Sequence, residues 1–422
     1  QGPDAQCLGW RSVDPVSGEV ADSYDKWMTY QEVADRARWF ASGILHLQLC
    51  PKNSEGYRMV GFCAKNSAAW TLAELGCYEF GIVPVPMYDS FDEETIRGII
   101  ELTELQVIVC SDAEKEKVMA AAKGTSVRVV AVFAVGGGGG MEEEVRVMTA
   151  WQEEVFAVGD GGGVDEEVQM MTAWQEEQVF QMAPGDNNGA RVVEFGSLLA
   201  VGRAHTLEEP GEGEQPTADD MAFLCFTSGT TGMPKAAMVS HGNMVAACRG
   251  SAGTIVSPNH RTRYLSWMPC PHIAERVSQL FVLCEGGSFG FFQGSPLKLS
   301  DDIQALRPTC FPTVPLLLDK IKDKIEAKVA AGGALKAAAF NKAMASKKGK
   351  APSKDTYWDR MVLQKVAKKV GIERVEIIAS GAAPLNGGTN AFIAALVGVP
   401  VVEAYGSTES TAAVSFTCPS DA

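Results

Sequence analysis

The chain has 422 residues, 46% of them hydrophobic, and its 52 acidic and 37 basic residues give a formal net charge of −15. This length and apolar content suffice for a large core organised as two or three subdomains, while the negative charge argues against nucleic acid as a partner. The eleven cysteines show neither a Cys-x-x-Cys pair nor a metal-ligand spacing, so we expect reduced, mostly buried thiols and no disulfide framework.

The amino-terminal third shows helical periodicity. Val33, Ala37, Phe40 and Ile44 recur at the spacing of one helix face. A second segment repeats the pattern around Trp70. Such helical patterns alternate along the chain with short apolar runs. The alternation predicts parallel βαβ units and therefore an α/β fold.

Residues 132–154 and 155–177 form a tandem duplication of a 23-residue unit. Both copies begin Val-Phe-Ala-Val-Gly and end Met-Thr-Ala-Trp-Gln-Glu-Glu. Two copies do not make a solenoid, which needs at least three repeats to bury a continuous core. We interpret 132–177 as a surface insertion with no catalytic role. A partner-binding patch and an artefact of the gene model remain open alternatives.

The most informative segment is 226–243, Phe-Thr-Ser-Gly-Thr-Thr-Gly-Met-Pro-Lys-Ala-Ala-Met-Val-Ser-His-Gly-Asn. Its glycines lack a Cβ, so backbone N–H groups can close on a polyphosphate, and Lys235 adds a compact positive charge. The spacing is not the Walker pattern. Because apolar runs flank the loop, we predict a strand–loop–strand phosphate clamp. A glycine-rich surface loop without a ligand is the alternative.

Two segments between this loop and the carboxyl end differ from their surroundings. Residues 265–276 place His272, Glu275 and Arg276 directly after an apolar run, and a histidine there either binds a ligand or is an ordinary structural residue. Residues 327–355 contain Ala and Gly runs followed by several lysines. We expect 327–355 to be a solvated loop, with attraction to an anionic membrane surface as the alternative.

Two further apolar runs end in polar or small residues. The first, 375–385, ends Ser-Gly-Ala-Ala-Pro-Leu, which leaves room for a flat ring against the backbone. The second, 399–410, ends Tyr-Gly-Ser-Thr-Glu-Ser. An aromatic face suits a purine, and a hard carboxylate oxygen suits Mg²⁺. A core tyrosine and a solvated glutamate are the alternative interpretations.

Together, 226–243, 375–385 and 399–410 resemble the adenylate-forming superfamily, which includes acyl-CoA synthetases, luciferase and peptide-synthetase adenylation domains. Residues 265–276 and 286–315 resemble the long-chain fatty acyl-CoA synthetases within it. The amino-terminal segments 7–11, 27–44, 81–90 and 99–109 do the same. Two positions depart from the family pattern. Ala236 stands where a glycine is usual, and Leu316 stands where an arginine is usual.

The resemblance implies a function for each motif. Tyr405 would stack on adenine, Thr408 would contact the α-phosphate, Glu409 would coordinate Mg²⁺, and His272 would orient the carboxylate. The catalytic residues would be Lys235, His272, Thr408 and Glu409. The residues that bind ATP would be Thr227, Ser228, Gly229, Thr230, Thr231, Gly232, Lys235, Gly381, Ala382, Ala383, Pro384, Tyr405, Gly406 and Thr408.

The resemblance also implies the fold and the reaction. The fold would comprise two βαβ-type sheets packed around helices, with a smaller β-barrel alongside. Family members continue into a Thr-Gly-Asp motif and a lid domain that donates a lysine, so we interpret 1–422 as an AMP-binding large domain, incomplete at both ends and not fully active alone. The expected reaction is ATP-dependent activation of a long-chain fatty acid to acyl-CoA, with Mg²⁺ and CoA.

Two other functions remain open from the sequence. One is adenylation of a different acid, such as an aryl acid or one destined for a carrier-protein thiol. The other is a non-catalytic nucleotide- or acyl-binding protein. No apolar stretch reaches the ~18 residues that cross a bilayer. We expect an intracellular location, in the cytoplasm or peripheral on the endoplasmic reticulum, a plastid or a peroxisome.

Overall fold

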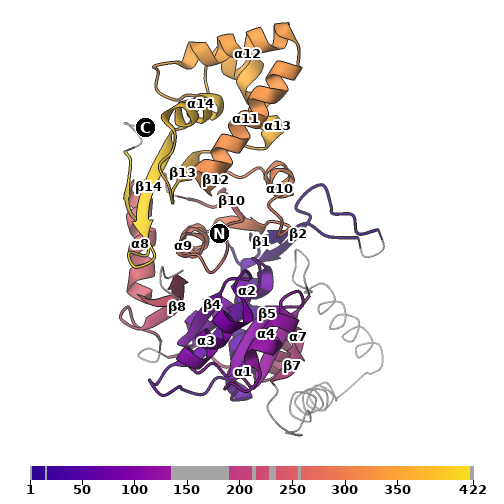
Figure 1. Cartoon of the computed structure of the whole chain (residues 1–422), viewed down its shortest axis with the longest axis vertical. Helices are drawn as coiled ribbons and strands as arrows, with labels where there is room; N and C mark the ends of the chain where they lie inside the picture. Colours follow the sequence, from indigo (N-terminus) through magenta and orange to yellow (C-terminus); the bar gives the residue numbers. More distant parts are fainter. Residues whose placement is uncertain are drawn as a thin grey trace.

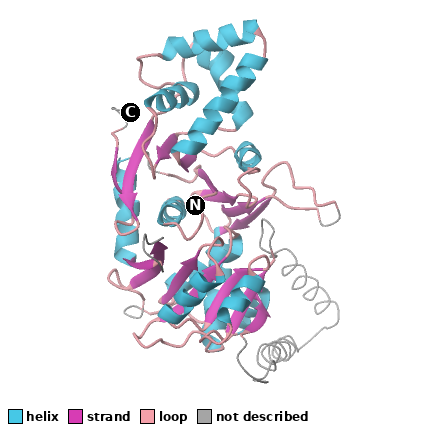
Figure 2. Cartoon of the chain, viewed as in Figure 1, coloured by secondary structure: helices cyan, strands magenta, loops and turns pink. Residues whose placement is uncertain are grey.

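The computed structural model describes residues 2–14, 17–134, 190–211, 215–227, 234–254 and 258–418. The duplication at 132–177 lies outside these ranges apart from its first residues, and so does the loop 228–233. The described residues form two large sheets and one hairpin, with helices between and around them (Figures 1 and 2). The α/β fold class predicted from the sequence is confirmed.

The first sheet has five strands, all parallel. Their order is β4 (Ile82–Met87), β3 (Arg58–Cys63), β5 (Val107–Ser111), β6 (Val129–Phe133) and β7 (Arg191–Glu194). Every residue of β5 is buried, because alternate side chains enter different cores on the two faces. Val107 and Val109 face one core, whereas Ile108 and Cys110 face the other.

Helices cover both faces of this sheet. One face packs against α1 (Tyr30–His46), α2 (Ala68–Glu79) and α7 (Phe195–Ala204), and the other against α3 (Glu93–Thr103) and α4 (Lys115–Ala122). Helix α1 begins in a capping box, in which the Thr29 side chain accepts from the Glu32 N–H and Glu32 accepts from the Thr29 N–H. The predicted helix face is confirmed, since Val33, Ala37, Phe40 and Ile44 are all buried.

The second sheet has eight strands. Their order is β15 (Ala412–Phe416), β14 (Val401–Ser407), β13 (Ile377–Ser380), β12 (Cys310–Thr313), β10 (Arg263–Ser266), β11 (Ser288–Phe291), β1 (Gln6–Trp10) and β2 (Lys26–Thr29). The inner pairs are parallel, and the outermost pair at each edge is antiparallel. The carboxyl ends of β12, β13 and β14 therefore lie together at one edge.

Helices also cover the second sheet. On one face, α9 (Ile273–Cys284) lies between the two sheets beside α2, and α8 (His241–Thr254) lies next to α9 (Figure 1). The other face carries a helical group, which consists of α10 (Leu299–Leu306), α11 (Pro315–Ala331), α12 (Ala334–Lys347), a π-helical turn (Asp359–Leu363), α13 (Gln364–Val370) and α14 (Gly387–Val397). The predicted helical layer between two sheets is therefore present.

Among the described residues, strands β8 (Met221–Thr227) and β9 (Lys235–Ser240) pair only with each other, as an antiparallel hairpin. The smaller β-barrel expected from the resemblance is wrong for the described residues, which contain no closed barrel. Strand β15 pairs with β14 at the edge of the eight-stranded sheet. Helices α8 and α9 pack between the hairpin and this edge.

The expected loop at 327–355 is also wrong for most of its length. Helix α11 continues to Ala331, and α12 covers Ala334–Lys347. Alanine and lysine are strong helix formers, so a segment rich in both becomes helical once one face finds a core. Phe340 and Ala343 supply that buried face. Gly332 and Gly333 separate the two helices, and Gly333 has a positive φ of 91°.

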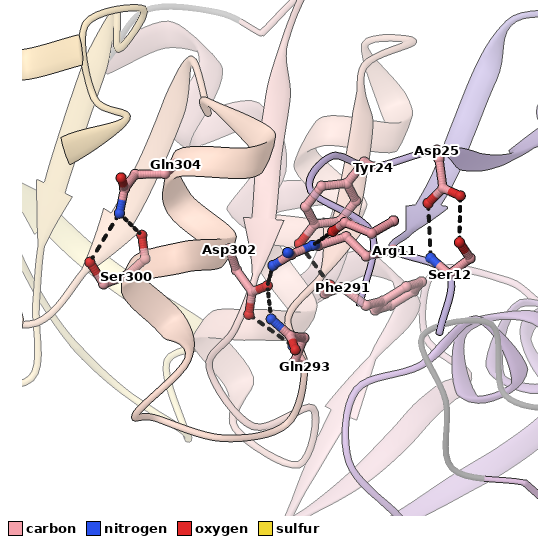
Figure 3. Close-up of polar contacts among 10 residues, drawn as sticks. Arg11, Ser12, Tyr24, Asp25, Phe291, Gln293, Ser300, Asp302 and Gln304 are labelled. Atoms are coloured by element: carbon pink, nitrogen blue, oxygen red, sulfur yellow. Dashed lines mark hydrogen bonds and ion pairs between the residues drawn. The ribbon is translucent and has the colours of Figure 1, made fainter. Parts of the chain in front are cut away.

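A buried ion pair holds the amino-terminal strands onto the helical side of the second sheet (Figure 3). Arg11 Nη1 lies 3.0 Å from Asp302 Oδ1 of α10, and both side chains are buried. The same carboxylate accepts from the backbone N–H of Gln293 at 2.9 Å and from its side-chain amide at 2.8 Å. Tyr24 donates to the carbonyl of Phe291 at 2.8 Å. These bonds satisfy the buried charges.

The cysteines are mostly buried, as the sequence predicted, with Cys284 and Cys418 exposed. In the described part of the chain, no helix is long and apolar enough to cross a bilayer.

Candidate functional site

The loop end of the β8–β9 hairpin carries the first predicted site residues. Thr227 and Lys235 face each other in register, and the Thr227 hydroxyl donates to the Lys235 carbonyl at 3.3 Å. The Lys235 side chain is exposed. Ser228, Gly229, Thr230, Thr231 and Gly232 lie outside the described residues, so the clamp geometry predicted for them stays a prediction. The strand–loop–strand arrangement itself is confirmed.

The tight turn between β14 and β15 carries the next group. A Cβ at Gly406 would lie 1.5 Å from the carbonyl oxygen of Ala412, so only glycine fits there. The Ser410 hydroxyl accepts from the Ser407 N–H at 2.9 Å and closes the turn. Glu409 is fully exposed, and hydrogen bonds from its own backbone N–H and from Ser407 lower the pKa of its carboxyl. Glu409 is therefore ionised at neutral pH.

The buried thiol of Cys225 marks the place where three of the predicted motifs meet. Cys225 belongs to β8, and its thiol donates to the carbonyl of Pro271, just before α9, at 3.3 Å. Burial is the main cause that raises the pKa of this thiol. The Glu409 charge raises it as well, and a hydrogen bond with Thr408 lowers it. Ala412, the first residue of β15, packs against the hydrophobic cluster that contains Cys225, so the strand that enters the phosphate loop lies near the β14–β15 turn.

A cavity of about 540 Å³ opens beside this junction. It contains six of the predicted residues, His272, Gly381, Ala382, Tyr405, Gly406 and Thr408. Most of the remaining lining is apolar, including Trp267, Ile273, Val277, Phe281, Pro312 and Val314. Ala383 and Pro384 are exposed and do not line the cavity. An apolar cavity with a few polar groups at one end is typical of a small-molecule site.

Tyr405 lies at this cavity with 76% of its surface exposed. A core tyrosine, the alternative left open by the sequence, is therefore excluded. The turn after the adjacent strand β13 also lines the cavity. In that turn Ala382 has a positive φ of 70°, an uncommon conformation for a residue with a Cβ. Glu403 of β14 accepts from the Leu385 N–H at 3.1 Å and so fixes that turn to the next strand.

His272 is the N-cap residue of α9. Its Nδ1 accepts from the Ala274 N–H at 3.1 Å, so the proton of the neutral ring resides on Nε2. Desolvation lowers the pKa of the imidazole. His272 is exposed to solvent yet lines the cavity, which reconciles its accessibility with that desolvation. The ring thus presents a neutral N–H donor near the cavity at pH 7.

Behind His272, the α9 side chains enter two buried polar clusters. The first, here called the Arg276 cluster, consists of Arg276, Glu74, Tyr78 and Phe223. Arg276 Nη2 lies 2.6 Å from Glu74 Oε1 and donates to the Tyr78 hydroxyl at 2.9 Å. Its guanidinium carbon stands 4.0 Å above the Phe223 ring. Although burial alone would lower it, the Glu74 charge leaves the pKa of Arg276 raised.

The Arg276 cluster connects three elements of the molecule, since Glu74 and Tyr78 belong to α2, Arg276 to α9 and Phe223 to β8. Because β8 leads into the glycine-rich loop, this cluster fixes that strand relative to the helix that begins at His272. Arg276 Nε and Nη1 are buried without hydrogen-bond partners in the described structure, so the geometry depends on the stack over Phe223 and on the contacts of Nη2 with Glu74 and Tyr78.

The second cluster surrounds Glu275, which is fully buried. Glu275 accepts from the Tyr264 hydroxyl and, at 2.9 Å, from the Gln279 side-chain amide. Burial outweighs these hydrogen bonds and raises the pKa of the carboxyl to about 7. Neighbouring residues 275 and 276 therefore secure α9 on opposite sides, one against β10 and the other against α2 and β8.

Sequence reasoning missed Glu74 and Tyr78. A signal was present, since Glu74 is a lone acidic residue inside an otherwise apolar stretch, 68–78. A carboxylate there needs a buried cation. The cavity-lining Trp267, Val277 and Phe281 were missed as well, because apolar side chains on a helix or strand do not indicate which cavity they will face.

Comparison with known proteins identifies the fold family. A family model described as AMP-binding enzyme matches residues 9–422. The chain is 30% identical to long-chain-fatty-acid–CoA ligase 5 of Rattus norvegicus over 98% of this chain and 54% of the relative. It is 32% identical to ligase 6 of Homo sapiens, over 98% and 53% respectively. The chain thus spans about half the length of these curated relatives.

Solved structures resemble it as well. The adenylation domain of a carboxylic acid reductase from Segniliparus rugosus, described in complex with AMP and a co-purified carboxylic acid, has a TM-score of 0.67 and 21% identity. It covers 96% of this chain and 58% of that one. A long-chain-fatty-acid–CoA ligase from Archaeoglobus fulgidus has a TM-score of 0.61, with 15% identity, 99% of this chain and 63% of that one. The chain belongs to the AMP-binding enzyme family.

Proposed function

We propose that this chain is the nucleotide- and acyl-binding part of an ATP-dependent long-chain fatty acid–CoA ligase. The observation that carries the proposal is the apolar cavity of about 540 Å³, which has Tyr405, Thr408 and His272 at its polar positions. An apolar cavity suits an acyl chain, and an exposed aromatic ring beside it suits a purine. The long-chain ligases among the curated relatives support the same substrate class.

The residues around the cavity have different roles in binding ATP. Tyr405 stacks on the adenine, which lies against the backbone of Gly381 and Ala382, while Ala383 and Pro384 shape the turn from outside. Thr408 contacts the α-phosphate. Lys235 and the amides of the loop 228–233 offset the charge of the outer phosphates. The packing of Ala412 against the cluster that contains Cys225 supports this arrangement, because it brings the β14–β15 turn near the strand that leads into the loop.

His272 orients the acid. Its neutral Nε2–H donates to one carboxylate oxygen, and the other oxygen attacks the α-phosphorus of ATP. The bond from that phosphorus to pyrophosphate breaks, and an acyl-adenylate forms. The sulfur of CoA then attacks the acyl carbonyl carbon and AMP leaves. A donor with a lowered pKa suits this role, because the ring stays neutral and keeps its hydrogen bond to Ala274.

The family also implies Mg²⁺. The described residues contain no cluster of three or more His, Cys, Asp or Glu side chains, but Mg²⁺ is commonly held by one or two carboxylates together with substrate phosphates and water. Glu409 fits that requirement because it is exposed and ionised and lies on the same turn as Thr408. Bound there with ATP, the ion would neutralise charge on the phosphates.

A second candidate is adenylation of another carboxylic acid. The fold similarity to adenylation domains of carboxylic acid reductases favours keeping it. The two candidates differ in what the cavity must accept, since a long acyl chain needs its full apolar depth. A non-catalytic nucleotide- or acyl-binding protein is the third candidate, and it predicts binding without turnover.

The test is a cavity-filling variant in the full-length protein. Ser278 lines the cavity from α9 and is half-buried. Ser278→Phe should shift acyl-CoA formation toward shorter acids, with kcat/KM for a long-chain acid falling by on the order of 10²-fold. Ser300→Phe, at a half-buried helix position outside the cavity, is the matched control and should leave the profile unchanged. An unchanged profile in Ser278→Phe would refute the acyl assignment.

A further inference from the structure

The charge of the molecule is divided unevenly between its parts. The segment 315–371, here called the helical lobe, contains 14 Lys and Arg residues against 5 Asp and Glu, a net charge of +9. The whole chain carries −15, so the rest of the molecule carries −24. The helical lobe comprises α11, α12, the π-helical turn and α13, all described. It lies at the end of the molecule away from the five-stranded sheet (Figure 1).

Most of these cations point into solvent. Lys347 is buried and ion-paired with Asp359 at 2.5 Å, and Lys322 and Lys354 are half-buried. Eleven others are exposed, namely Lys320, Lys324, Lys328, Lys336, Lys342, Lys348, Lys350, Arg360, Lys365, Lys368 and Lys369. A cluster of like charges destabilises the folded chain. An anionic partner that binds the helical lobe would relieve this repulsion.

Helix α12 shows what kind of anion fits. It has no acidic residue, and Phe340, Ala343 and Lys347 form its buried face. Its opposite face carries Leu335, Ala338, Lys342 and Ala345, all exposed, and Leu335 is 85% exposed. Nearby on the helical lobe, Tyr357 is 67% and Met361 46% exposed. Exposed apolar side chains among lysines are the composition of a helix that lies in a membrane interface.

The identity of the cations separates a lipid surface from nucleic acid. Thirteen of the fourteen are lysines. Lysine is a point charge, well suited to diffuse attraction by anionic headgroups, whereas nucleic-acid recognition makes heavy use of the planar arginine fork. The net charge of −24 elsewhere repels any polyanion that extends beyond the helical lobe. A planar membrane avoids that repulsion, because the lobe stands at one end.

We propose that the helical lobe is a docking surface for anionic lipid membranes, with the outward face of α12 in the interface and the surrounding lysines over the headgroups. This docking is separate from the proposed reaction. It would bring the protein to a surface where apolar acids reside, but the lipid contact itself needs neither ATP nor turnover.

The experiment is co-sedimentation of the full-length protein with vesicles. Phosphatidylcholine vesicles that contain phosphatidylserine should bind the protein, and vesicles of phosphatidylcholine alone should not. The quadruple reversal Lys336→Glu, Lys342→Glu, Lys348→Glu and Lys350→Glu should weaken binding by on the order of 10²-fold or more. Leu335→Ser should weaken it by about tenfold, because the buried apolar contact is lost. Binding should also weaken as salt screens the headgroups.

Two matched controls make the result specific. Replacing the same four lysines by arginine keeps the charge and should keep the binding. Reversing four exposed cations outside the helical lobe, Lys52→Glu, Lys123→Glu, Arg128→Glu and Arg249→Glu, makes the same change in net charge and should leave binding within about twofold. Circular dichroism and acyl-CoA formation in detergent show whether each variant is folded.

Three outcomes would overturn the proposal. One is equal binding to both kinds of vesicle, and another is equal loss in the reversal variant and its control outside the lobe. The third is tight binding to single-stranded RNA with no binding to anionic vesicles, which would identify the lobe as a nucleic-acid surface. Loss of the proposed ligase activity with vesicle binding intact would refute the proposed function and leave this inference standing.

Discussion

Helix α9 joins two regions with opposite physical character. At its N-cap, His272 borders a cavity that Tyr405 and Thr408 also line, and solvent reaches all three side chains. One turn further on, Glu275 and Arg276 are buried in clusters that water does not reach. Exposed groups of the first region contribute little to the core. In the second region, each charged side chain is buried, so it is stable there only while its partner is present.

The chemistry of the site and the placement of its residues therefore reside in different regions. The side chains that a ligand can contact carry the chemistry of the site, and they can be substituted without unfolding the protein. The Arg276 cluster and the cluster around Glu275 hold these side chains in place. A substitution in either cluster should first lower the free energy of unfolding. Substitutions in the exposed region should therefore leave the stability unchanged. Substitutions in the buried region should act first on stability and leave the chemistry of the exposed side chains unchanged.

The largest effect is expected at Arg276. Arg276→Met keeps the side-chain volume but leaves the Glu74 carboxylate buried without its cation, and the free energy of unfolding should fall by about 3–5 kcal/mol. Arg276→Lys keeps the charge but loses the planar stack over Phe223, so the loss should be smaller. Chemical denaturation gives both values.

A double variant checks the cause of that loss. If the unpaired carboxylate is responsible, Glu74→Gln combined with Arg276→Met should recover a large part of the stability that Arg276→Met alone loses. Additive losses in the double variant would mean that the two side chains act independently and that the ion pair does not organise the cluster.

In the exposed region, Glu409→Gln should lower acid-dependent ATP–pyrophosphate exchange by on the order of 10²-fold, because it removes the charge that Mg²⁺ prefers. The free energy of unfolding should stay within about 0.5 kcal/mol, since the side chain is fully exposed. Glu116→Gln, an exposed glutamate on α4, is the control. Wild-type exchange with wild-type Mg²⁺ dependence in Glu409→Gln would remove the metal assignment.

Glu275 should give the buried region a pH signature. Its pKa rises from 4.5 to about 7 on folding, so the neutral form is the one the native state favours. The stability it contributes is complete below pH 4.5 and is lost as the pH rises through 7. Between pH 5 and 8 the free energy of unfolding of the wild type should fall by about 2 kcal/mol relative to that of Glu275→Gln.

Glu285→Gln, at the exposed end of the same helix, is the control for that measurement and should follow the wild type. Parallel pH profiles for wild type and Glu275→Gln in chemical denaturation would show that Glu275 stays ionised in the native state.

The smallest effect is expected outside both regions. Deleting 155–177 removes one copy of the duplication and leaves the other to connect the same ends. A change in loop length costs about 0.6 kcal/mol per doubling, so the melting temperature should barely move and exchange activity should persist. Loss of exchange in a folded deletion variant would place the repeat in the site.

The sequence predicted the α/β fold class and the hairpin around the glycine-rich loop, because period-2 and period-3.6 patterns are local. It also predicted that Tyr405, Thr408 and His272 are site residues, and the structure places all three at one cavity. The helices at 327–355 were misjudged, since alanine and lysine suit both a solvated loop and a helix until a partner such as the core around Phe340 decides.

Other features could not be predicted because they depend on contacts between distant segments. Glu74 and Arg276 are about two hundred positions apart in the sequence, and nothing local pairs them. Arg11 and Asp302 form a buried ion pair over an even longer separation. The β-barrel expectation was wrong for the described residues for a related reason, since strand pairing beyond a hairpin depends on contacts between distant segments.

In the proposed function, the cavity beside Tyr405 holds a long-chain acid that is activated with ATP. The most direct measurement is incorporation of labelled pyrophosphate into ATP by the full-length protein, with a long-chain fatty acid, an aryl acid or no acid present. We expect exchange that depends on the long-chain acid and falls in Tyr405→Ala through a higher KM for ATP, since the stacking surface is lost. Exchange stimulated by the aryl acid alone, or no exchange with any acid, would contradict the account.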